Sequence, residues 1–234
     1  MVDFTGGTWR SLIDGSEVSA IPDTELLRWP INEGSGDSIT DEVTGKTATT
    51  TASWDEGQWF EDWALDFDGT DDRLSYSTSF GDLSEFTLLI ECSIHESPDG
   101  NDYQIWESDD GNFDNWIQFT DGSNKDIQFD GGLTYSNSGR VIAEPGTDFE
   151  VNIGEKFIIG YRYDGNEHSM VGNDQIVATE SASGTINIDS HPSEWAYRTS
   201  SSRYTDIKIG SVRYNETGLS DSDISNWYNQ MPWS

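Results

Sequence analysis

The sequence has 234 residues, which is enough for one large core, and all-β sandwiches of this length commonly form a single domain. Hydrophobic residues make up 33% of the chain and Phe, Trp and Tyr make up 12%, so we expect a folded protein with an aromatic core and exclude a disordered chain. A net charge of −32 excludes nucleic acid as a main electrostatic partner, and no stretch approaches the ~18 consecutive apolar residues of a membrane span.

The acidic excess also indicates adaptation to very high salt. The chain has 44 acidic and 12 basic residues, and only four of the basic residues are lysines. At molar salt the Debye length falls to ~3 Å, so repulsion between surface carboxylates is screened. An acidic, lysine-poor chain that still carries a full set of core aromatics is typical of haloarchaeal proteins.

Residues 1–23 differ from the rest of the chain because their apolar residues, such as Phe4, Trp9 and Leu12, are isolated among glycine, serine and acidic positions. We interpret this segment as an N-terminal arm for docking or oligomerisation. The alternative is a strand or loop packed on its own domain. Residues 24–234 are expected to form one domain.

The turn at residues 67–72 brings three carboxylates together: Asp68, Asp71 and Asp72. Calcium binds carboxylate and carbonyl oxygens gathered in a turn, so this is a candidate metal site. The alternative is that aspartate favours turns in any case, and that a salt-adapted surface multiplies such clusters.

Alternation of apolar residues with a period of two predicts strands that have one buried face. It occurs at Phe86, Leu88, Ile90, Cys92 and Ile94, at Ile117 and Phe119, and at Phe157, Ile159, Tyr161 and Tyr163. Asp-Gly and Gly-Asn pairs between such stretches predict turns. Many short strands with regular turns predict a sandwich or jelly roll, and Cys92, the only cysteine, is expected to be a small buried hydrophobe.

The middle of the chain holds the candidate ligand-binding residues. Exposed aromatic rings stack on sugar C–H groups, while neighbouring Asp and Asn side chains bond the hydroxyls. The aromatic candidates are Trp106, Trp116 and Tyr135, and the polar candidates are Asp109, Asp110 and Asn112, which together with Asp114 also form a second possible calcium site. The alternative for the aromatic residues is a place in the core.

Catalytic residues are not assigned. The nearest match to a glycosidase carboxylate pattern is Glu107-Ser108-Asp109, which lacks a second glutamate and runs into a Gly-Asn turn. The three histidines, His95, His168 and His191, do not have metal-ligand spacing. We therefore expect a protein that is not an enzyme.

One helix is expected near the C-terminus. Ser220 and Asp223 form a capping pattern, and the residues that follow have helical spacing: Ile224, Trp227, Tyr228 and Met231. This helix is expected to pack flat on the sandwich, with its aromatic residues in the core.

Five segments, in order and spacing, resemble the laminin G-like, concanavalin A-like jelly-roll family. They are LLRWPINEGSGDSITDEVTGKTATTTASW (26–54), ALDFDGTDDRLSYS (64–77), FTLLIECSI (86–94), FIIGYRYDGNEHSMVGNDQIV (157–177) and IGSVRYNETGLSDSDISNWY (209–228). They include the family's E-G-S-G turn at 33–36, its F-D-G-x-D-D hairpin at 67–72 and its Leu219-Ser220 helix cap. Gly210 and Ser211 depart from an acidic pair common in the family's last strand, which counts against a calcium site transferred by analogy.

The resemblance implies an all-β fold of two antiparallel sheets in a jelly-roll sandwich, with a short C-terminal helix. It further implies that the concave sheet or its rim loops present a carbohydrate or protein ligand. Because this fold also hosts hydrolases and structural domains, the site has to decide the function.

The segment TGGTWRS (5–11) is similar to the leading segment of acidic laminin G-like chains of haloarchaeal viruses and proviruses. This implies a homo-oligomeric particle component on the virion surface, such as a capsid turret, spike or tail appendage. Its partners would be other virion subunits, through the arm, and a host cell-surface glycan or glycoprotein, with no nucleic acid and no membrane insertion. The alternatives are a location on the haloarchaeal cell surface, a glycoside hydrolase or its carbohydrate-binding accessory module, and a purely structural decoration protein.

Overall fold

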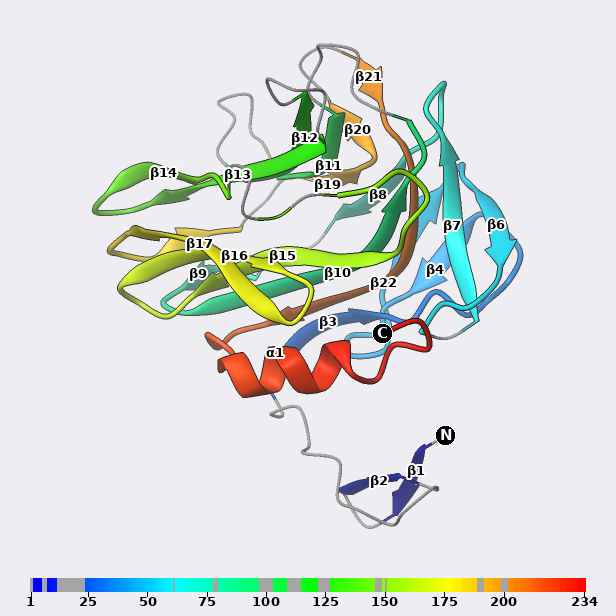
Figure 1. The fold of residues 1–234 in the computed structure, drawn as a ribbon, viewed down its shortest axis with the longest axis horizontal. Helices are drawn as coiled ribbons and strands as arrows, with labels where there is room; N and C mark the ends of the chain where they lie inside the picture. Colours follow the sequence, from blue (N-terminus) through cyan, green and yellow to red (C-terminus); the bar gives the residue numbers. More distant parts are fainter. Residues whose placement is uncertain are drawn as a thin grey trace.

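In the computed structural model, the described part of the chain forms two packed antiparallel sheets with one short helix on the outside (Figure 1). The structure describes the strands at 2–5 and 8–11, and residues 24–60, 62–77, 80–96, 103–108, 115–121, 127–145, 149, 151–188, 192–198 and 202–234. Within these residues, the prediction of an all-β jelly-roll sandwich with a short C-terminal helix is confirmed.

The sheet on which the helix packs is called here the lower sheet. Its described strands run in the order β17 (Gln175–Ser181), β16 (Glu167–Gly172), β15 (Phe157–Tyr163), β10 (Phe86–Ile94), β22 (Asp206–Asn215), β7 (Trp63–Asp68) and β6 (Ser53–Glu56), and β3 (Glu25–Trp29) also pairs with β22. The two predicted strands at 86–94 and 157–163 are therefore direct neighbours, with Ile90 opposite Ile159.

The other layer is called the upper sheet. Its described strands run in the order β4 (Ser38–Thr40), β5 (Thr47–Thr50), β8 (Leu74–Ser77), β19 (Pro192–Trp195), β11 (Tyr103–Ser108), β12 (Asn115–Asp121), β13 (Ile127–Tyr135), β18 (Ile186–Asn187) and β9 (Asp82–Leu83), and β14 (Gly139–Ala143) also pairs with β13. The predicted strand around Ile117 and Phe119 is β12.

Two small hairpins complete the described strands. One joins β1 (Val2–Thr5) to β2 (Thr8–Ser11), inside the segment expected to be an arm, and the other joins β20 (Tyr197–Arg198) to β21 (Arg203–Tyr204). Most of the remaining arm lies outside the described residues, so the division at residue 23 stays a prediction.

The core between the sheets is rich in aromatic side chains, as the composition predicts. The ring of Trp29 lies 5.0 Å from Tyr76 and 5.4 Å from Trp195, centroid to centroid, in edge-on contacts. Such edge-to-face pairs are favoured by the ring quadrupoles. Cys92 is fully buried in this core, as predicted.

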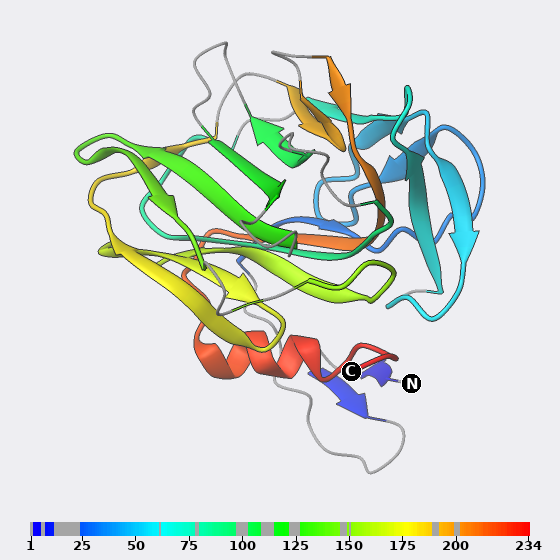
Figure 2. The same cartoon turned by 45° about the horizontal axis from the view of Figure 1, so that its top comes forward.

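The helix α1 (Asp221–Tyr228) covers the outer face of the lower sheet (Figure 2). Ser220 caps it as predicted, because its side chain accepts a hydrogen bond from the backbone N–H of Asp223. Ile224 and Trp227, with Met231 just beyond the helix, pack on Leu89, Ile158 and Val171. Strand β10 is consequently buried along its whole length, although its alternation predicts only one buried face.

The turn at residues 67–72 differs from the hairpin that the family resemblance implies. Strand β7 before it belongs to the lower sheet, whereas β8 after it belongs to the upper sheet. The turn therefore carries the chain between layers. A second crossing segment, between β5 and β6, lies beside it, since the backbone N–H of Thr51 donates to the carbonyl of Arg73 at 3.0 Å.

Candidate functional site

The candidate site lies on the outer face of the upper sheet, where β12 presents Trp116 and Gln118. Their neighbours Ile117 and Phe119 belong to the core, and side chains alternate along a strand, so Trp116 and Gln118 lie on the face turned away from the core. The helix α1 lies on the opposite side of the sandwich (Figure 2). This outer face is therefore not the one that the helix covers.

The strand register sets the neighbours of Trp116. It is opposite Glu107 of β11 on one side and Gly132 of β13 on the other. Glu107 is in turn opposite Glu194 of β19. In the adjacent row, Gln104 of β11 is opposite Gln118.

Gly132 explains how the large Trp116 side chain fits on the sheet. A Cβ atom at residue 132 would lie 2.2 Å from the indole ring, so the ring lies directly against the backbone of β13. Gly131 likewise leaves room for an aromatic side chain on the inner face, because a Cβ at residue 131 would lie 1.5 Å from the hydroxyl oxygen of Tyr161. The Asp-Gly pair at 130–131 is thus inside a strand rather than in a turn, because both faces of β13 need room for an aromatic side chain.

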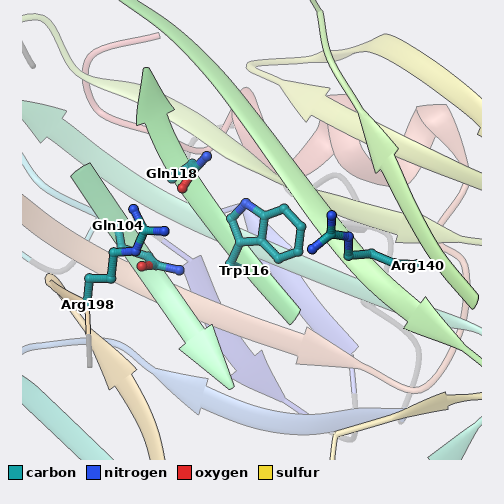
Figure 3. Close-up of a pocket in the computed structure, with 5 residues that line it drawn as sticks. All are labelled: Gln104, Trp116, Gln118, Arg140 and Arg198. Atoms are coloured by element: carbon teal, nitrogen blue, oxygen red, sulfur yellow. The ribbon is translucent and has the colours of Figure 1, made fainter. Parts of the chain in front are cut away.

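Around Trp116 the surface forms a pocket of about 180 Å³ lined by Gln104, Trp116, Gln118, Arg140 and Arg198. Figure 3 shows the indole between Arg140 on one side and Gln104 with Arg198 on the other. The guanidinium carbon of Arg140 is 5.3 Å from the centroid of the indole ring. Pockets for drug-sized ligands hold roughly 300–1,000 Å³, so this one fits a single small unit rather than a whole chain.

Two pocket residues, Gln104 and Trp116, each have a buried polar atom without a hydrogen-bond partner among the described residues. The atoms are Oε1 of Gln104 and Nε1 of Trp116, whose residues are only 2% and 8% exposed. An unsatisfied buried polar group costs roughly 1–3 kcal/mol. The pocket offers an aromatic ring, two amides and two guanidinium groups.

A pair of carboxylates lies beside the pocket. Glu194 accepts a hydrogen bond from the hydroxyl of Ser75 at 2.7 Å. Burial raises the pKa of Glu194, while the Ser75 hydroxyl and the charge of Arg73 oppose that rise. Glu107 is only 1% exposed, so its side chain is closed off from solvent.

The structure places one of the three predicted aromatic ligand residues at the pocket and the other two in the core. Trp116 lines the pocket, but the expectation that Trp106 and Tyr135 present exposed rings is wrong. Trp106 is fully buried, and Tyr135 is 2% exposed with its ring 4.7 Å from that of Tyr163. Both lie in the core between the sheets. The polar candidates Asp109, Asp110 and Asn112, like Asp114, lie outside the described residues.

The candidate calcium ligands do come together. Asp68, Asp71 and Asp72 can each point one oxygen so that the three oxygens lie within 4.8 Å of one another. Two of them also stabilise the turn, since Asp68 accepts from the backbone N–H of Thr70 at 2.8 Å and Asp72 from that of Asp68 at 3.2 Å. Burial raises the pKa of Asp72, as do the nearby carboxylates. Calcium binding stays a prediction.

Four of the five pocket residues were not identified from the sequence. Gln118 is two positions after Trp116, so the period of two in β12 would have placed both on one face. Gln104, Arg140 and Arg198 come from strands far apart in the sequence, and only the sheet order and the contact of the β20–β21 hairpin with β11 bring them together. Among the described residues, no helix is long and apolar enough to cross a membrane.

No protein-family model matches the sequence, and no curated protein matches it. Solved structures do resemble it. The binding domain of Paraclostridial Mosquitocidal Protein 1 aligns with a TM-score of 0.68 and 12% identity, covering 88% of this chain and 52% of that chain. A structure of botulinum neurotoxin type C aligns with a TM-score of 0.64 and 11% identity over 89% of this chain and 51% of that chain.

A third structure matches over nearly its whole length. It is domain 4 of AbnA, an extracellular arabinanase from Geobacillus stearothermophilus, with a TM-score of 0.66, 9% identity and coverage of 89% of this chain and 98% of that chain. The chain spans about half the length of the two toxin structures. At these identities the likeness shows the fold alone: this chain shares the β-sandwich architecture of all three.

Proposed function

We propose that this chain is a non-catalytic, lectin-like domain that binds a saccharide in the pocket on the outer face of the upper sheet. The observation that carries the proposal is the Trp116 pocket, in which an indole ring is flanked by amide and guanidinium groups. Sugars are bound by aromatic rings that pack on their C–H faces and by polar groups that fix the hydroxyls. The pocket supplies both kinds of group.

The similar structures support this proposal. The printed description of the botulinum neurotoxin type C structure states that cell entry depends on interaction with two ganglioside molecules. Domain 4 of AbnA was solved in complex with arabinotriose. Both ligands contain sugars, and both proteins share the sandwich architecture of this chain.

We further propose the setting that the sequence suggests, namely a component of a haloarchaeal virus particle that attaches to a host-surface glycan or glycoprotein. The acidic composition and the TGGTWRS segment support this setting. In this proposal the arm contacts other virion subunits and the domain is a homo-oligomer. Mass spectrometry of purified particles tests it: the protein should be present at a stoichiometric level, and its absence would rule the setting out.

Replacing Trp116 by alanine tests the saccharide-binding proposal. A glycan array of neutral and acidic oligosaccharides identifies the strongest binder, and titration calorimetry then measures its Kd. Trp116→Ala is expected to weaken binding by about tenfold or more, because it removes the aromatic surface of the pocket. The matched control is Trp54→Ala, which removes a partly exposed tryptophan from β6 of the lower sheet. Unchanged affinity in a folded Trp116→Ala protein would sink the proposal.

Glycoside hydrolysis is the second candidate, and one observation favours it. Glu107 and Glu194 are directly opposite each other on neighbouring strands, where Cβ atoms lie ~5 Å apart. Their carboxyl groups are therefore close enough to act as a pair, as the ~5–5.5 Å separation in retaining glycosidases requires. Against it, Glu107 is closed off from solvent. Release of reducing sugar from a bound polysaccharide, lost in Glu194→Gln, would establish hydrolysis; binding without any release supports the non-catalytic function.

A further inference from the structure

We propose that the ligand of the Trp116 pocket is an acidic saccharide, whose carboxylate or sulfate group is bound by Arg140 with help from Arg198. This inference rests on the proposed saccharide-binding function and names the class of sugar that the pocket selects.

The first argument is the presence of two cations in one pocket. The chain has 44 acidic residues and only eight arginines, yet two of those arginines line one pocket of about 180 Å³. Neutral sugars are held by hydroxyl, amide and aromatic groups and do not need a cation. Positive charge concentrated in a strongly acidic protein indicates a negatively charged ligand.

The second argument is the contrast between Arg140 and other basic side chains. On or beside the lower sheet, Arg28 pairs with Glu42, Lys208 with Asp55 and Asp66, and Arg162 with Asp221. Among the described residues Arg140 makes no such ion pair. It is exposed on β14, and its guanidinium lies over the indole of Trp116 instead.

The third argument is chemical geometry. A guanidinium group is planar and presents a fork of N–H donors that matches carboxylate and sulfate oxygens two at a time. Contact with the indole restrains the orientation of Arg140, so less side-chain entropy is lost on binding. An acidic sugar in the pocket can therefore direct its charged group to Arg140.

The acidic groups on the same face fix the orientation of the ligand. Glu107 is next to Trp116 on β11, and Asp130 of β13 is opposite Gln118. Arg140 lies on the other side of Trp116 from Gln104 and Arg198 (Figure 3). The charged group of the sugar is thus expected at the Arg140 end of the pocket, away from Glu107, with the hydroxyls toward Gln104 and Gln118.

The test is titration calorimetry of the full chain in about 2 M KCl, where long-range repulsion between the acidic protein and an acidic ligand is screened but direct contacts remain. Two matched pairs of probes are used: trigalacturonate with its methyl ester, and a sulfated carrageenan tetrasaccharide with its desulfated form. The pair that shows the preference identifies carboxylate or sulfate as the recognised group. Arg140→Gln and Arg198→Gln are compared with Arg28→Gln, which removes one positive charge from the lower sheet.

The acidic member of at least one pair is expected to bind about tenfold or more tightly than its neutral partner, and Arg140→Gln should abolish most of that preference. Arg28→Gln should preserve it. Equal binding of acidic and neutral members, or a preference that persists in both pocket variants, overturns the inference and leaves saccharide binding standing. If neither these probes nor any saccharide on the array binds, the inference and the proposed function fail together.

Discussion

At the scale of single residues, His168 has an environment that makes stability depend on pH. Its side chain is fully buried between the sheets, with its ring 4.9 Å from that of Tyr161 and 5.9 Å from that of Tyr135. Burial lowers the pKa of His168 to about 4. The neutral imidazole is therefore the form that the folded protein accommodates.

Folding should accordingly become less favourable in acid because of this one residue. The unfolded state takes up the proton near pH 6.5 and the folded state only near pH 4, so the stability from neutral His168 is complete above 6.5 and is lost toward pH 4. The loss amounts to about 3 kcal/mol below pH 4. Chemical denaturation of wild type and His168→Leu from pH 7.5 to 4, at about 2 M KCl, measures the difference.

The comparison with His168→Leu cancels the many carboxylates that titrate in the same range. His95→Leu is the control, because His95 has a side chain 33% exposed beside Asp206. Parallel curves for wild type and His168→Leu would contradict the prediction.

The positions of Trp106, Trp116 and Tyr135 show which side-chain orientations can be predicted from the neighbouring sequence and which cannot. Trp116 alternates with Ile117 and Phe119, so its outward position can be read from the period of two. Strand β11 breaks that period, because its register with β12 shifts between Gln104 and Trp106. Ile105 and Trp106 are both in the core as a result, and a bulge of this kind has no clear signature in the sequence.

At the scale of elements, Glu91 joins the C-terminal segment to the lower sheet. Its carboxylate accepts hydrogen bonds from the indole N–H of Trp233 at 2.8 Å, the hydroxyl of Ser211 at 3.0 Å and the backbone N–H of Phe60 at 3.2 Å. A Cβ at Gly210 would lie 2.6 Å from this carboxylate. Gly210 thus leaves room for the Glu91 carboxylate, and Ser211 donates a hydrogen bond to it.

Replacing Glu91 by glutamine should destabilise the fold by roughly 1–3 kcal/mol, because one acceptor oxygen is lost and an amide N–H₂ faces other donors. Denaturation at constant salt measures the free energy, and hydrogen exchange of the Trp233 indole reports release of the C-terminal segment. Glu85→Gln is the control: Glu85 is exposed and accepts one hydrogen bond, from the backbone N–H of Gly218 at 3.2 Å. Equal losses in the two variants would argue against this role of Glu91.

Element prediction succeeded where the signal is local. The capping pattern at Ser220 and Asp223 and the alternation in β10 both lie within a few residues of the structures that they predict. What the alternation did not show is that α1 buries the second face of β10. That burial depends on a contact between elements more than one hundred residues apart in the sequence.

At the scale of the whole molecule, the charge of −32 should make stability depend on salt. The Debye length is ~10 Å at 0.1 M salt and ~3 Å at 1 M, so repulsion across the surface is strong in dilute buffer and weak in brine. We expect the Tm to rise steadily as KCl is raised from about 0.1 M to about 2 M. An osmolyte series in sucrose controls for solvent exclusion, and a Tm that follows sucrose but not KCl would count against adaptation to salt.

The sequence by itself determined the class of fold, the buried faces of the regular strands and the capped C-terminal helix, because these follow from composition and short-range periodicity. It also determined the acidic surface and its expected response to salt. Only the tertiary structure decided the pocket, since Gln104, Trp116 and Arg140 become neighbours through the strand order β11, β12, β13 and β14, and Arg198 joins them because the β20–β21 hairpin lies against β11. The pairing register decides which side chains become neighbours across a sheet. The register between strands that are distant in the sequence cannot be predicted from a short segment of the chain.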